Sequence, residues 1–282
     1  MTGHKVYFIT GAGRGIARDL ITAALEAGHS VVATARDASQ ITDVVGEHER
    51  LLTLSVDVTD LAAIEESVYK AHERFGSIDV LINNAGRFYA GFFETVSPDS
   101  VRAQMEVNFF GTLNVTRAIL PIMRAQRRGH IVSVSALYGI VGAPFVSSYA
   151  ASKFAMEGWA ESLAAEVEPF GIRTTIVEPG AFRTRADPTH AARSVFPDNN
   201  IDDYAEATKK STASFKYHNG REAGHPTKLA YALAKVVDMD PPPKRWVAGT
   251  DAYKGIIAKG EQLVKDANVL YELTTSLGWD DV

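Results

Sequence analysis

The sequence predicts an α/β fold: a single domain built on a doubly wound parallel sheet of about seven strands, with helices on both faces. Three observations lead to this prediction. Short apolar runs alternate with helical patterns over the first two-thirds of the chain, as in repeated β-α-β units. These runs are apolar almost throughout, which is typical of strands buried on both faces. The composition, 46% hydrophobic and 22% charged over 282 residues, is that of a globular protein.

Six apolar runs in the first two-thirds are expected to be strands. They are Lys5–Thr10, Ser30–Thr34, Leu51–Val56, Asp79–Asn83, His130–Ser135 and Arg173–Val177. Helical patterns separate most of them. One helix is expected to begin near Ile16, and the others to span roughly Leu61–Phe75, Pro98–Arg127 and Ser147–Glu168. Because crossovers between parallel strands are right-handed, these helices are expected to cover both faces of the sheet.

The last third of the chain changes character. Segment 181–224 contains prolines, an Asn-Asn pair and an Asn-Gly pair, which indicate a broken helix-and-loop region. A helix over Pro226–Met239 is expected to stop at three consecutive prolines, and Arg245–Ala248 is expected to be the last strand. The amphipathic stretch Ala252–Ala267 begins a C-terminal tail that runs to residue 282. No internal repeat divides the chain, so residues 1–282 are expected to form one domain.

The composition excludes several classes of function. There are no cysteines, so disulfides and cysteine-based zinc sites are impossible, and a reducing, cytoplasmic location is favoured. A net charge of −5 argues against sequence-independent binding of nucleic acid. No apolar run approaches the roughly 18–20 residues of a membrane span, so no membrane partner is expected. Three histidines of the last third, His190, His218 and His225, lack metal-ligand spacing, so no metal site is expected.

A glycine-rich turn follows the first strand directly, in the sequence Thr10-Gly11-Ala12-Gly13-Arg14-Gly15-Ile16-Ala17. Glycine lets the backbone approach a ligand closely, and a helix N-terminus offers unpaired N–H groups and the positive end of its dipole to a pyrophosphate. The position of the turn therefore favours a dinucleotide site on Gly11, Gly13, Gly15 and Ile16 over a simple tight connection.

Two arginines are expected to decide which dinucleotide binds. The second strand ends in Ala35-Arg36, where an NAD site usually places an acidic residue against the ribose 2′-hydroxyl. Arg14 lies in the glycine turn itself. Two guanidinium groups near this ribose would favour a 2′-phosphate, so NADP(H) is the predicted cofactor. The alternative is that both arginines are ordinary solvated surface groups.

The ends of the third and fourth strands are expected to extend the same crevice. Asp57-Val58 is placed to meet the adenine ring, and Asn84-Ala85-Gly86 follows the fourth strand. Ligands of doubly wound sheets bind at the carboxyl ends of the strands, beside the reversal of strand order. Taken alone, the sequence Asn-Asn-Ala-Gly is merely a good turn.

Tyr149-Ala-Ala-Ser-Lys153 places a phenol and an ammonium group four residues apart, on one face of an expected helix. A free Tyr titrates near pH ~10, and a neighbouring cation is expected to lower the pKa of Tyr149 toward neutrality. A Tyr tuned in this way can exchange a proton with a carbonyl or alcohol oxygen while a nicotinamide moves hydride. The spacing by itself is common, and any single match is more often an unremarkable helix face.

Taken together, these motifs resemble the short-chain dehydrogenase/reductase family, whose sheet is of the Rossmann type. Two further matches are Asn108 within Val-Asn-Phe-Phe-Gly-Thr, and Pro179-Gly180 followed by Thr184. The resemblance covers roughly residues 3–184 and, more loosely, 225–255. It implies that Tyr149 is the acid–base and that Lys153 binds the nicotinamide ribose. It also implies that Asn108 holds a water linked to Lys153, and that Pro179, Gly180 and Thr184 line the nicotinamide amide and phosphate. The other interpretation of Asn108 is a residue that caps or kinks a helix.

The sequence departs from the family at one catalytic position. The family carries a Ser thirteen residues before the Tyr, and here that position is Ala136. Ser135 is adjacent, but successive side chains of an extended strand point to opposite faces, so Ser135 is expected to face away unless a bulge re-aims it. Losing a positioned donor of this kind can cost roughly 10²–10³ in kcat.

Three explanations fit Ala136. The residue is a deliberate substitution that traps a complex, a natural variant in which Ser135, Ser133 or Ser148 takes over, or the mark of a degraded enzyme that mainly binds cofactor. The first is favoured because every other expected residue is present. The corresponding functions are an NADP(H)-dependent carbonyl reductase or alcohol dehydrogenase and, as the alternative, a catalytically weak NADP(H)-binding protein.

The substrate region implied by the resemblance is the segment of about residues 185–224. Its aromatic and apolar side chains, with others on the facing walls, favour a small hydrophobic ketone or secondary alcohol as substrate, although each one singly could pack the core. They are Val195, Phe196, Tyr204, Phe215 and Tyr217, and on the other walls Phe88, Tyr89, Phe92, Phe93, Leu137, Tyr138, Phe145 and Val146. The family also implies a homo-oligomer, a dimer or tetramer, built through the long helices near residues 98–127 and 147–168.

Overall fold

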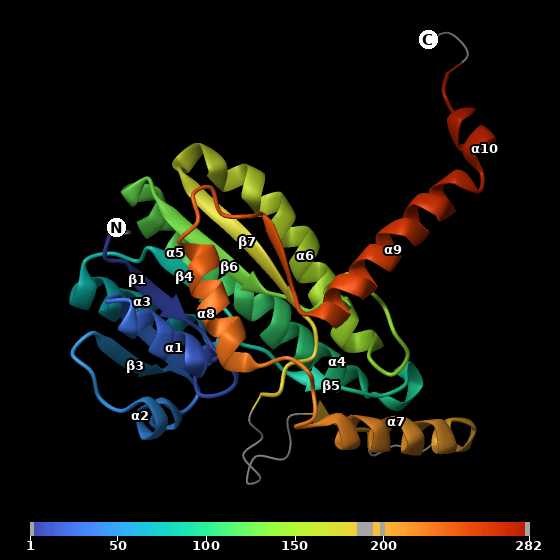
Figure 1. Cartoon of the computed structure of the whole chain (residues 1–282), viewed down its shortest axis with the longest axis horizontal. Coiled ribbons are helices and arrows are strands. Elements are labelled where there is room, and N and C mark those ends of the chain that lie inside the picture. Colours follow the sequence, from blue (N-terminus) through green and yellow to red (C-terminus); the bar gives the residue numbers. More distant parts are fainter. Residues whose placement is uncertain (1–2, 185–193, 198–200, 280–282) are drawn as a thin grey trace.

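The computed structural model describes residues 3–184, 194–197 and 201–279. Seven parallel strands form one sheet, as predicted (Figure 1). From one edge to the other they are β3 (Leu51–Ser55), β2 (Ser30–Ala35), β1 (Val6–Ile9), β4 (Val80–Asn83), β6 (Gly129–Val134), β7 (Ile172–Pro179) and β9 (Arg245–Ala248). The strand order reverses between β1 and β4, so the crevice of a doubly wound sheet is expected at the carboxyl ends of these two strands.

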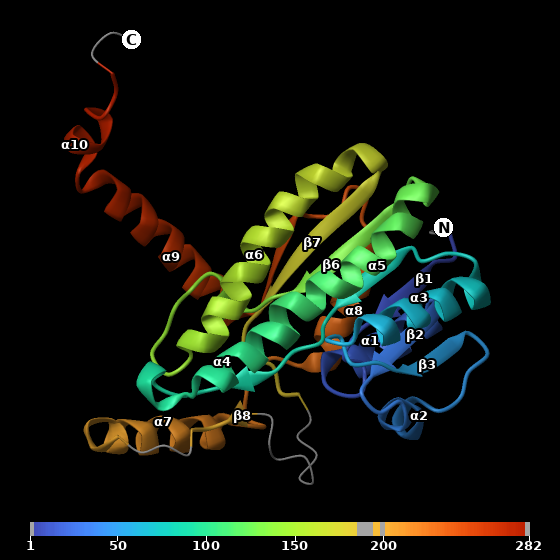
Figure 2. The same cartoon turned by 180° about the vertical axis from the view of Figure 1, so that it is seen from behind.

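Helices cover both faces of the sheet because alternate strand residues enter two separate cores. In β1, Tyr7 and Ile9 pack toward α1 (Ile16–Glu26) and α8 (Pro226–Val237). Val6 and Phe8 of the same strand pack toward the opposite layer (Figures 1 and 2). That layer consists of α3 (Leu61–Phe75), α5 (Gly111–Gln126) and α6 (Ser147–Val167). This double burial is the physical reason for the unbroken apolar runs in the sequence.

The predicted helix over Pro98–Arg127 is interrupted. It consists of α4 (Pro98–Met105), a π-helical turn (Glu106–Phe110) and α5. Such turns insert an extra residue into an α-helix and are frequent at functional sites. The turn carries Asn108 and buries it completely.

Several short elements were not predicted. Helix α2 (Ser39–Val45) follows β2, and a two-stranded parallel sheet pairs β5 (Phe88–Tyr89) with β8 (Ser194–Val195). Helix α7 (Ala205–His218) lies within the segment expected to be broken, and residues 185–193 and 198–200 of that segment lie outside the described residues. The C-terminal tail is helical, with α9 (Thr250–Asn268) and α10 (Tyr271–Thr275) projecting away from the rest of the molecule (Figure 1).

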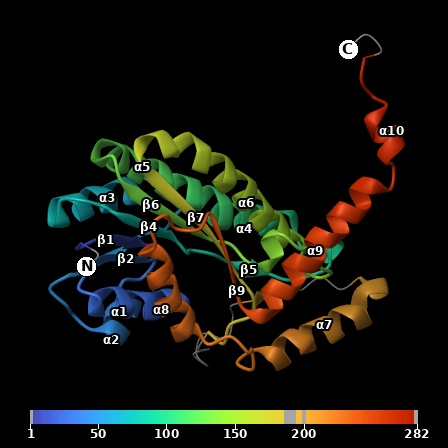
Figure 3. The ribbon, with the colours of Figure 1, turned by 45° about the horizontal axis from the view of Figure 1, so that its top comes forward.

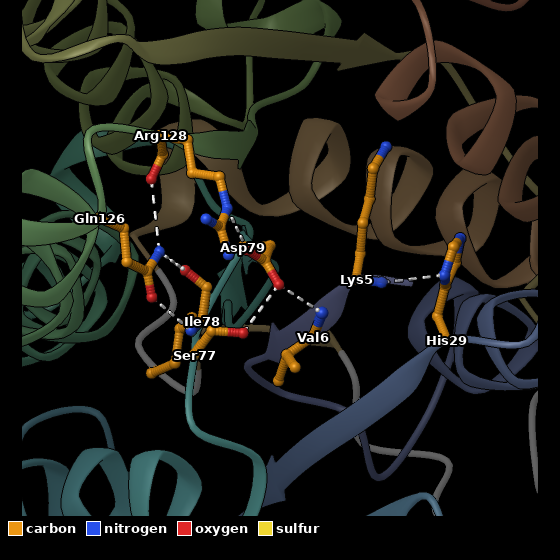
Figure 4. A network of polar contacts seen from close by, with 8 residues as sticks. All are labelled: Lys5, Val6, His29, Ser77, Ile78, Asp79, Gln126 and Arg128. Atoms are coloured by element: carbon orange, nitrogen blue, oxygen red, sulfur yellow. Dashed lines mark hydrogen bonds and ion pairs between the residues drawn. The ribbon is translucent and has the colours of Figure 1, made fainter. Parts of the chain in front are cut away.

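A polar network fixes the amino ends of the central strands, opposite the expected crevice (Figure 4). The carboxylate of Asp79 accepts hydrogen bonds from the backbone N–H of Val6 at 2.9 Å and from Ser77 at 3.0 Å, and it pairs with Arg128 at 3.1 Å. Gln126 bonds both backbone groups of Ile78. These contacts hold β1 and β4 side by side where no ligand is expected, which leaves the carboxyl ends free to form the site.

Candidate active site

The glycine turn and the loop after β4 are tied together. The hydroxyl of Thr10 accepts hydrogen bonds from the backbone N–H groups of Asn84 at 3.0 Å and Ala85 at 3.1 Å. The Asn84 amide in turn donates to the carbonyls of Thr10 and Gly11. Gly11 has a φ of 64°, and a Cβ there would stand 2.7 Å from the Cα of Ala85. Only glycine allows this approach, so the loop residues Asn84 and Ala85 pack directly against the glycine turn and hold its backbone in place.

Helix α1 begins at Ile16, immediately after Gly15, whose φ is 67°. No side chain caps the helix, and Ile16 packs against the core. The first turn therefore presents backbone N–H groups at the crevice, which is the arrangement that binds phosphate at a helix N-terminus. A Cβ on Gly13 would stand 3.1 Å from the Cβ of Ala35 and would displace the end of the Gln40 side chain, so this part of the turn is also closely packed.

A cluster of arginines lies beside this turn. Partial burial, together with repulsion from Arg36 and Arg87, lowers the pKa of Arg14. Burial alone would raise the pKa of Asp57, but hydrogen bonds from Thr59 and the charges of Arg36 and Arg87 outweigh it, so the net shift is downward. Arg14, Arg36 and Arg87 thus act on the same small region at the ends of β1, β2 and β4. Three cations concentrated there favour an anionic ligand.

Val58, predicted to meet the adenine, is buried against Gly111 of α5, and its carbonyl accepts a hydrogen bond from Asn114 at 3.3 Å. Its side chain therefore packs on α5. Gly86 follows Ala85 at the mouth of the same loop, and its α-carbon faces the side chain of Asn108.

Tyr149 and Lys153 lie together on α6, with the Lys153 ammonium 5.9 Å from the centre of the Tyr149 ring. Lys153 is 4% exposed, and its Nζ donates a hydrogen bond to the carbonyl of Val134 at 2.8 Å. Val134 is the last residue of β6. The predicted pair is thus present at the carboxyl edge of the sheet, where the crevice opens.

The predicted direction of the Tyr149 pKa was wrong for this arrangement. Burial, and secondarily the charge of Tyr138, raise the pKa of the Tyr149 phenol above its ordinary value. Burial also lowers the pKa of Lys153 to about 8, although Glu157 opposes the shift. Because both groups lose water, each pKa moves in the direction that favours the neutral form.

Asn108 is linked to the catalytic helix α6 through hydrogen bonds to its neighbours. Its side chain bonds the backbone of Arg87 in both directions, accepting at 2.7 Å and donating at 3.0 Å. It also donates to the hydroxyl of Ser152, which donates to the carbonyl of Tyr149 at 2.7 Å. Asn108 therefore joins the loop after β4 to the first turns of α6.

Ala136 follows β6 in an extended conformation and is 8% exposed. Ser135 faces the other way, as the strand alternation predicted. Its hydroxyl lies against Gly139 and near the carboxylate of Glu157, and among the described residues neither this hydroxyl nor Oε1 of Glu157 has a hydrogen-bond partner. Burial raises the pKa of Glu157. Glu157 and Glu178 share one nitrogen of Arg245, at 2.6 Å and 2.5 Å. The Ser135 side chain thus lies next to this ion-pair cluster.

Pro179 is the last residue of β7, and Gly180 begins the loop that follows it. The N–H of Gly180 bonds the carbonyl of Ala248 in β9 at 2.9 Å, and the N–H of Ala181 bonds the carboxylate of Asp251 at 2.7 Å. The N–H of Thr184 bonds the carbonyl of Phe182 at 2.7 Å. The first turn of α9 therefore holds this loop at the crevice.

Aromatic side chains form a continuous wall beside Tyr149. Its ring makes edge contacts with Phe88, at 4.8 Å between centroids, and with Tyr138, at 6.4 Å. Phe88 packs on Phe215 of α7 at 5.7 Å. The wall continues through further rings that the sequence had placed around a substrate, namely Phe92, Phe145, Phe196 and Tyr204.

Sequence reasoning missed three residues that shape the site. Arg87 directly follows Asn-Asn-Ala-Gly, and this position could have drawn attention to its charge. Asp251 and Glu157 carry no local motif, because their roles depend on contacts with segments about 70 and 20 residues away in the sequence. Among the described residues, no three potential metal ligands gather, and no helix is long and apolar enough to cross a membrane.

Comparisons with known proteins agree with this geometry. The family model described as short chain dehydrogenase matches residues 5–193. Oxidoreductase BOA17 of Botryotinia fuckeliana is 39% identical over 250 residues, covering 88% of this chain and 90% of the relative. A 3-ketodihydrosphingosine reductase of Bacteroides thetaiotaomicron is 35% identical over 269 residues. The match covers 95% of this chain and 96% of that reductase. The crystal structure of a short-chain dehydrogenase from Streptomyces avermitilis superposes with a TM-score of 0.90 at 33% identity, covering 98% of this chain and 100% of that one.

Proposed function

The chain belongs to the short-chain dehydrogenase family, and from that premise we propose that it is an NADP(H)-dependent carbonyl reductase or alcohol dehydrogenase acting on hydrophobic substrates. The family's oxidoreductases use a nicotinamide cofactor. The observation that carries the proposal is the Tyr149–Lys153 pair, which lies beside the aromatic wall and is bonded to the carboxyl end of β6. The pair, the glycine turn and the aromatic wall correspond to a proton donor, a dinucleotide site and a hydrophobic substrate site.

The residues at the glycine turn fit a dinucleotide. The close approach of Gly11 to Ala85 and the uncapped start of α1 leave room for a pyrophosphate at the helix N-terminus. Arg14, Arg36 and Arg87 would hold a 2′-phosphate, which supports NADP(H) over NAD(H). Pro179, Gly180 and Thr184 would line the nicotinamide end. When bound, the cofactor supplies or accepts the hydride at the carbon of the substrate.

Tyr149 is the proton donor in the direction of ketone reduction. Its raised pKa keeps the phenol protonated at neutral pH, so it holds the proton that the substrate oxygen must receive. Lys153 stabilises the phenolate left after the transfer, because an ammonium group beside it favours the charged form. Asn108 and Ser152 fix the backbone of Tyr149, because Asn108 donates to the Ser152 hydroxyl and that hydroxyl donates to the Tyr149 carbonyl.

The aromatic wall supports a ketone or secondary alcohol with bulky apolar groups. Phe88, Phe145 and Phe215 pack on one another beside Tyr149, and such surfaces recognise hydrocarbon rather than charge. The relative from Bacteroides thetaiotaomicron is named for the reduction of a ketone, 3-ketodihydrosphingosine. We infer a substrate of the same general class, a carbonyl on an apolar framework.

Ala136 supports a second candidate, a catalytically weak NADP(H)-binding protein. The family's Ser hydroxyl has no counterpart at this position, and Ser135 faces Glu157 behind the site. In this alternative the dinucleotide site is intact and turnover is lost. Restoring the hydroxyl distinguishes the two functions.

We further propose that the protein is a homo-oligomer of the reducing cytoplasm. Phe110, at the end of the π-helical turn before α5, is 43% exposed, and Phe154 on α6 is 45% exposed. Both lie in the long helical stretches that the sequence analysis singled out. Large apolar side chains in such positions favour helix-to-helix contact between subunits.

The test of the proposed function is NADPH oxidation followed by absorbance with a panel of apolar ketones, including a long-chain 3-ketone. The expected result is ketone-dependent oxidation of NADPH with a lower kcat/KM for NADH. Turnover with none of the ketones, and oxidation of none of the corresponding alcohols by NADP⁺, would contradict the enzyme and favour the binding protein, provided that NADPH still binds.

A further inference from the structure

The C-terminal helices form a projecting arm, residues 250–275. Within the described part of the chain, the arm meets the body at the base of α9 (Figure 3). There Ala252 is buried, and Gly255 lies against Leu137. Beyond the base, every residue from 260 to 275 is exposed. Large apolar side chains are among them, with Leu263 53% and Val264 65% exposed. An apolar surface of this kind marks an interaction site.

The apolar side of the arm follows a heptad spacing. Tyr253, Ile256, Gly260, Leu263 and Ala267 are separated by three, four, three and four residues. This alternation is typical of the seam of a two-stranded coiled coil. There each apolar side chain at these positions inserts between side chains of the facing helix. Ile257 and Val264 broaden the seam on one side.

The arm has little reason to be helical by itself. It contains Gly255 and Gly260, and four of its apolar residues are β-branched, all of which lower helix propensity. Helices in proteins gain most of their stability from packing an apolar face rather than from propensity. A facing helix would supply that packing.

The charges of the arm identify the kind of partner. It carries three lysines and four acidic residues, so it is not the strongly basic helix that binds an anionic membrane surface. An antiparallel copy of the same helix fits better. In the register that places Gly260 opposite Leu263 of the partner subunit, Lys259 lies opposite Asp266 of the partner subunit. In this register the small Gly260 faces a large leucine side chain, and the ammonium group of Lys259 faces a carboxylate.

We propose that the arm pairs antiparallel with the arm of a second copy of this chain, about a two-fold axis near Glu261 and Gln262. The contact is isologous, so each arm makes the same set of interactions with the other. It is separate from α5 and α6 and does not depend on the proposed catalytic activity. In this arrangement each α10 reaches toward the base of the other α9, where Leu137 and Gly255 meet beside Ala136.

The first test measures the molar mass of the full chain by light scattering across a concentration series. Leu263→Asp is expected to halve the mass, whether it converts a dimer to a monomer or a tetramer to a dimer. Ala258→Asp introduces the same charge on the opposite side of the helix and is expected to leave the mass unchanged. An unchanged mass for Leu263→Asp would overturn the proposal, as would a monomeric wild-type chain whose arm binds phosphatidylcholine vesicles.

The second test exchanges the charges across the pair. Lys259→Asp and Asp266→Lys are each expected to weaken association about tenfold, and the double variant is expected to restore it. Loss of association in the single variants without rescue in the double variant would show that the arm docks on another part of the partner, contrary to the proposal.

The third test uses the absence of natural cysteines. A mixture of Lys259→Cys and Asp266→Cys chains is expected to form a mixed disulfide dimer faster than either variant alone, because the antiparallel register brings those two positions together. Equal rates for the mixture and the separate variants would contradict the register. Circular dichroism of each variant verifies that the fold is retained.

Discussion

The carboxylate of Asp251 accepts a hydrogen bond from the backbone N–H of Ala181 at 2.7 Å and lies where a side chain on Gly180 would stand. The contact joins the first turn of α9 to the loop after β7. That loop is proposed to line the nicotinamide, so Asp251 is a positioning residue for cofactor binding.

Replacing Asp251 tests this role. Asp251→Ala is expected to raise the dissociation constant of NADPH about tenfold. A charge-assisted hydrogen bond contributes roughly 1.5–3 kcal/mol, and because Asp251 is exposed the lower end of this range applies. Asp251→Asn keeps an acceptor and is expected to recover most of the affinity. Fluorescence titration with NADPH measures both, with Glu261→Ala on the arm as control. Wild-type affinity in Asp251→Ala would contradict the role.

The arginine cluster predicts cofactor selectivity. Arg36→Ala is expected to weaken NADPH binding by about 10–100-fold and to leave NADH binding nearly unchanged, because only NADPH carries the 2′-phosphate. Arg87→Ala is expected to act in the same direction. Arg102→Ala removes an exposed arginine of α4 and serves as the control. An equal loss of affinity for the two cofactors would exclude a 2′-phosphate role.

Ala136→Ser tests the missing hydroxyl. The variant is expected to raise the kcat of ketone reduction by about 10²–10³, the range seen when a positioned donor is removed elsewhere. Ser135→Ala is expected to leave kcat nearly unchanged, since Ser135 faces Glu157. If Ser135→Ala abolishes turnover while Ala136→Ser has no effect, Ser135 is the natural substitute and the assignment of the position is wrong.

The buried Lys153 predicts a dependence of stability on pH. Its pKa falls from 10.5 to about 8 on folding, so the folded chain releases this proton before the unfolded chain does. The cost of burying the ammonium is fully present below pH 8, and the free energy of unfolding rises as the pH increases from there toward 10. The full difference corresponds to about 3 kcal/mol.

Urea unfolding of the cofactor-free protein between pH 7.5 and 9.5 measures this effect, below the range in which Tyr149 contributes in the opposite sense. Lys153→Met is expected to remove the rise and to stabilise the protein at pH 7.5. Parallel pH profiles for the wild type and Lys153→Met would show that Lys153 is not the group responsible.

Much of the fold could be predicted from the sequence because local patterns determine it. The run Lys5–Thr10 is apolar on both faces, and its residues do enter two separate cores. The helix predicted over Leu61–Phe75 is observed with the same bounds. The interruption at Glu106–Phe110 was anticipated only as the alternative interpretation of Asn108, because the contacts of Asn108 with Arg87 and Ser152 join segments that are far apart in the sequence.

In the candidate site, too, the features set by local sequence could be predicted, and those set by long-range contacts could not. The glycine turn and the Tyr149–Lys153 pair are short-range motifs and were predicted by residue. The direction of the Tyr149 pKa was not, because it depends on burial by rings from distant segments, such as Phe88 and Tyr138. Asp251 and Arg87 likewise gain their roles only when separate loops meet at the crevice.

The central claim is that the Tyr149 hydroxyl delivers the proton during ketone reduction. The most direct measurement is single-turnover oxidation of bound NADPH by Tyr149→Phe, performed in the Ala136→Ser background if the wild type is slow. The variant is expected to bind NADPH normally and to lose about 10²–10⁴ in rate, the usual contribution of a general acid. Hydride transfer at an unchanged rate in Tyr149→Phe, with normal NADPH binding, would contradict the account.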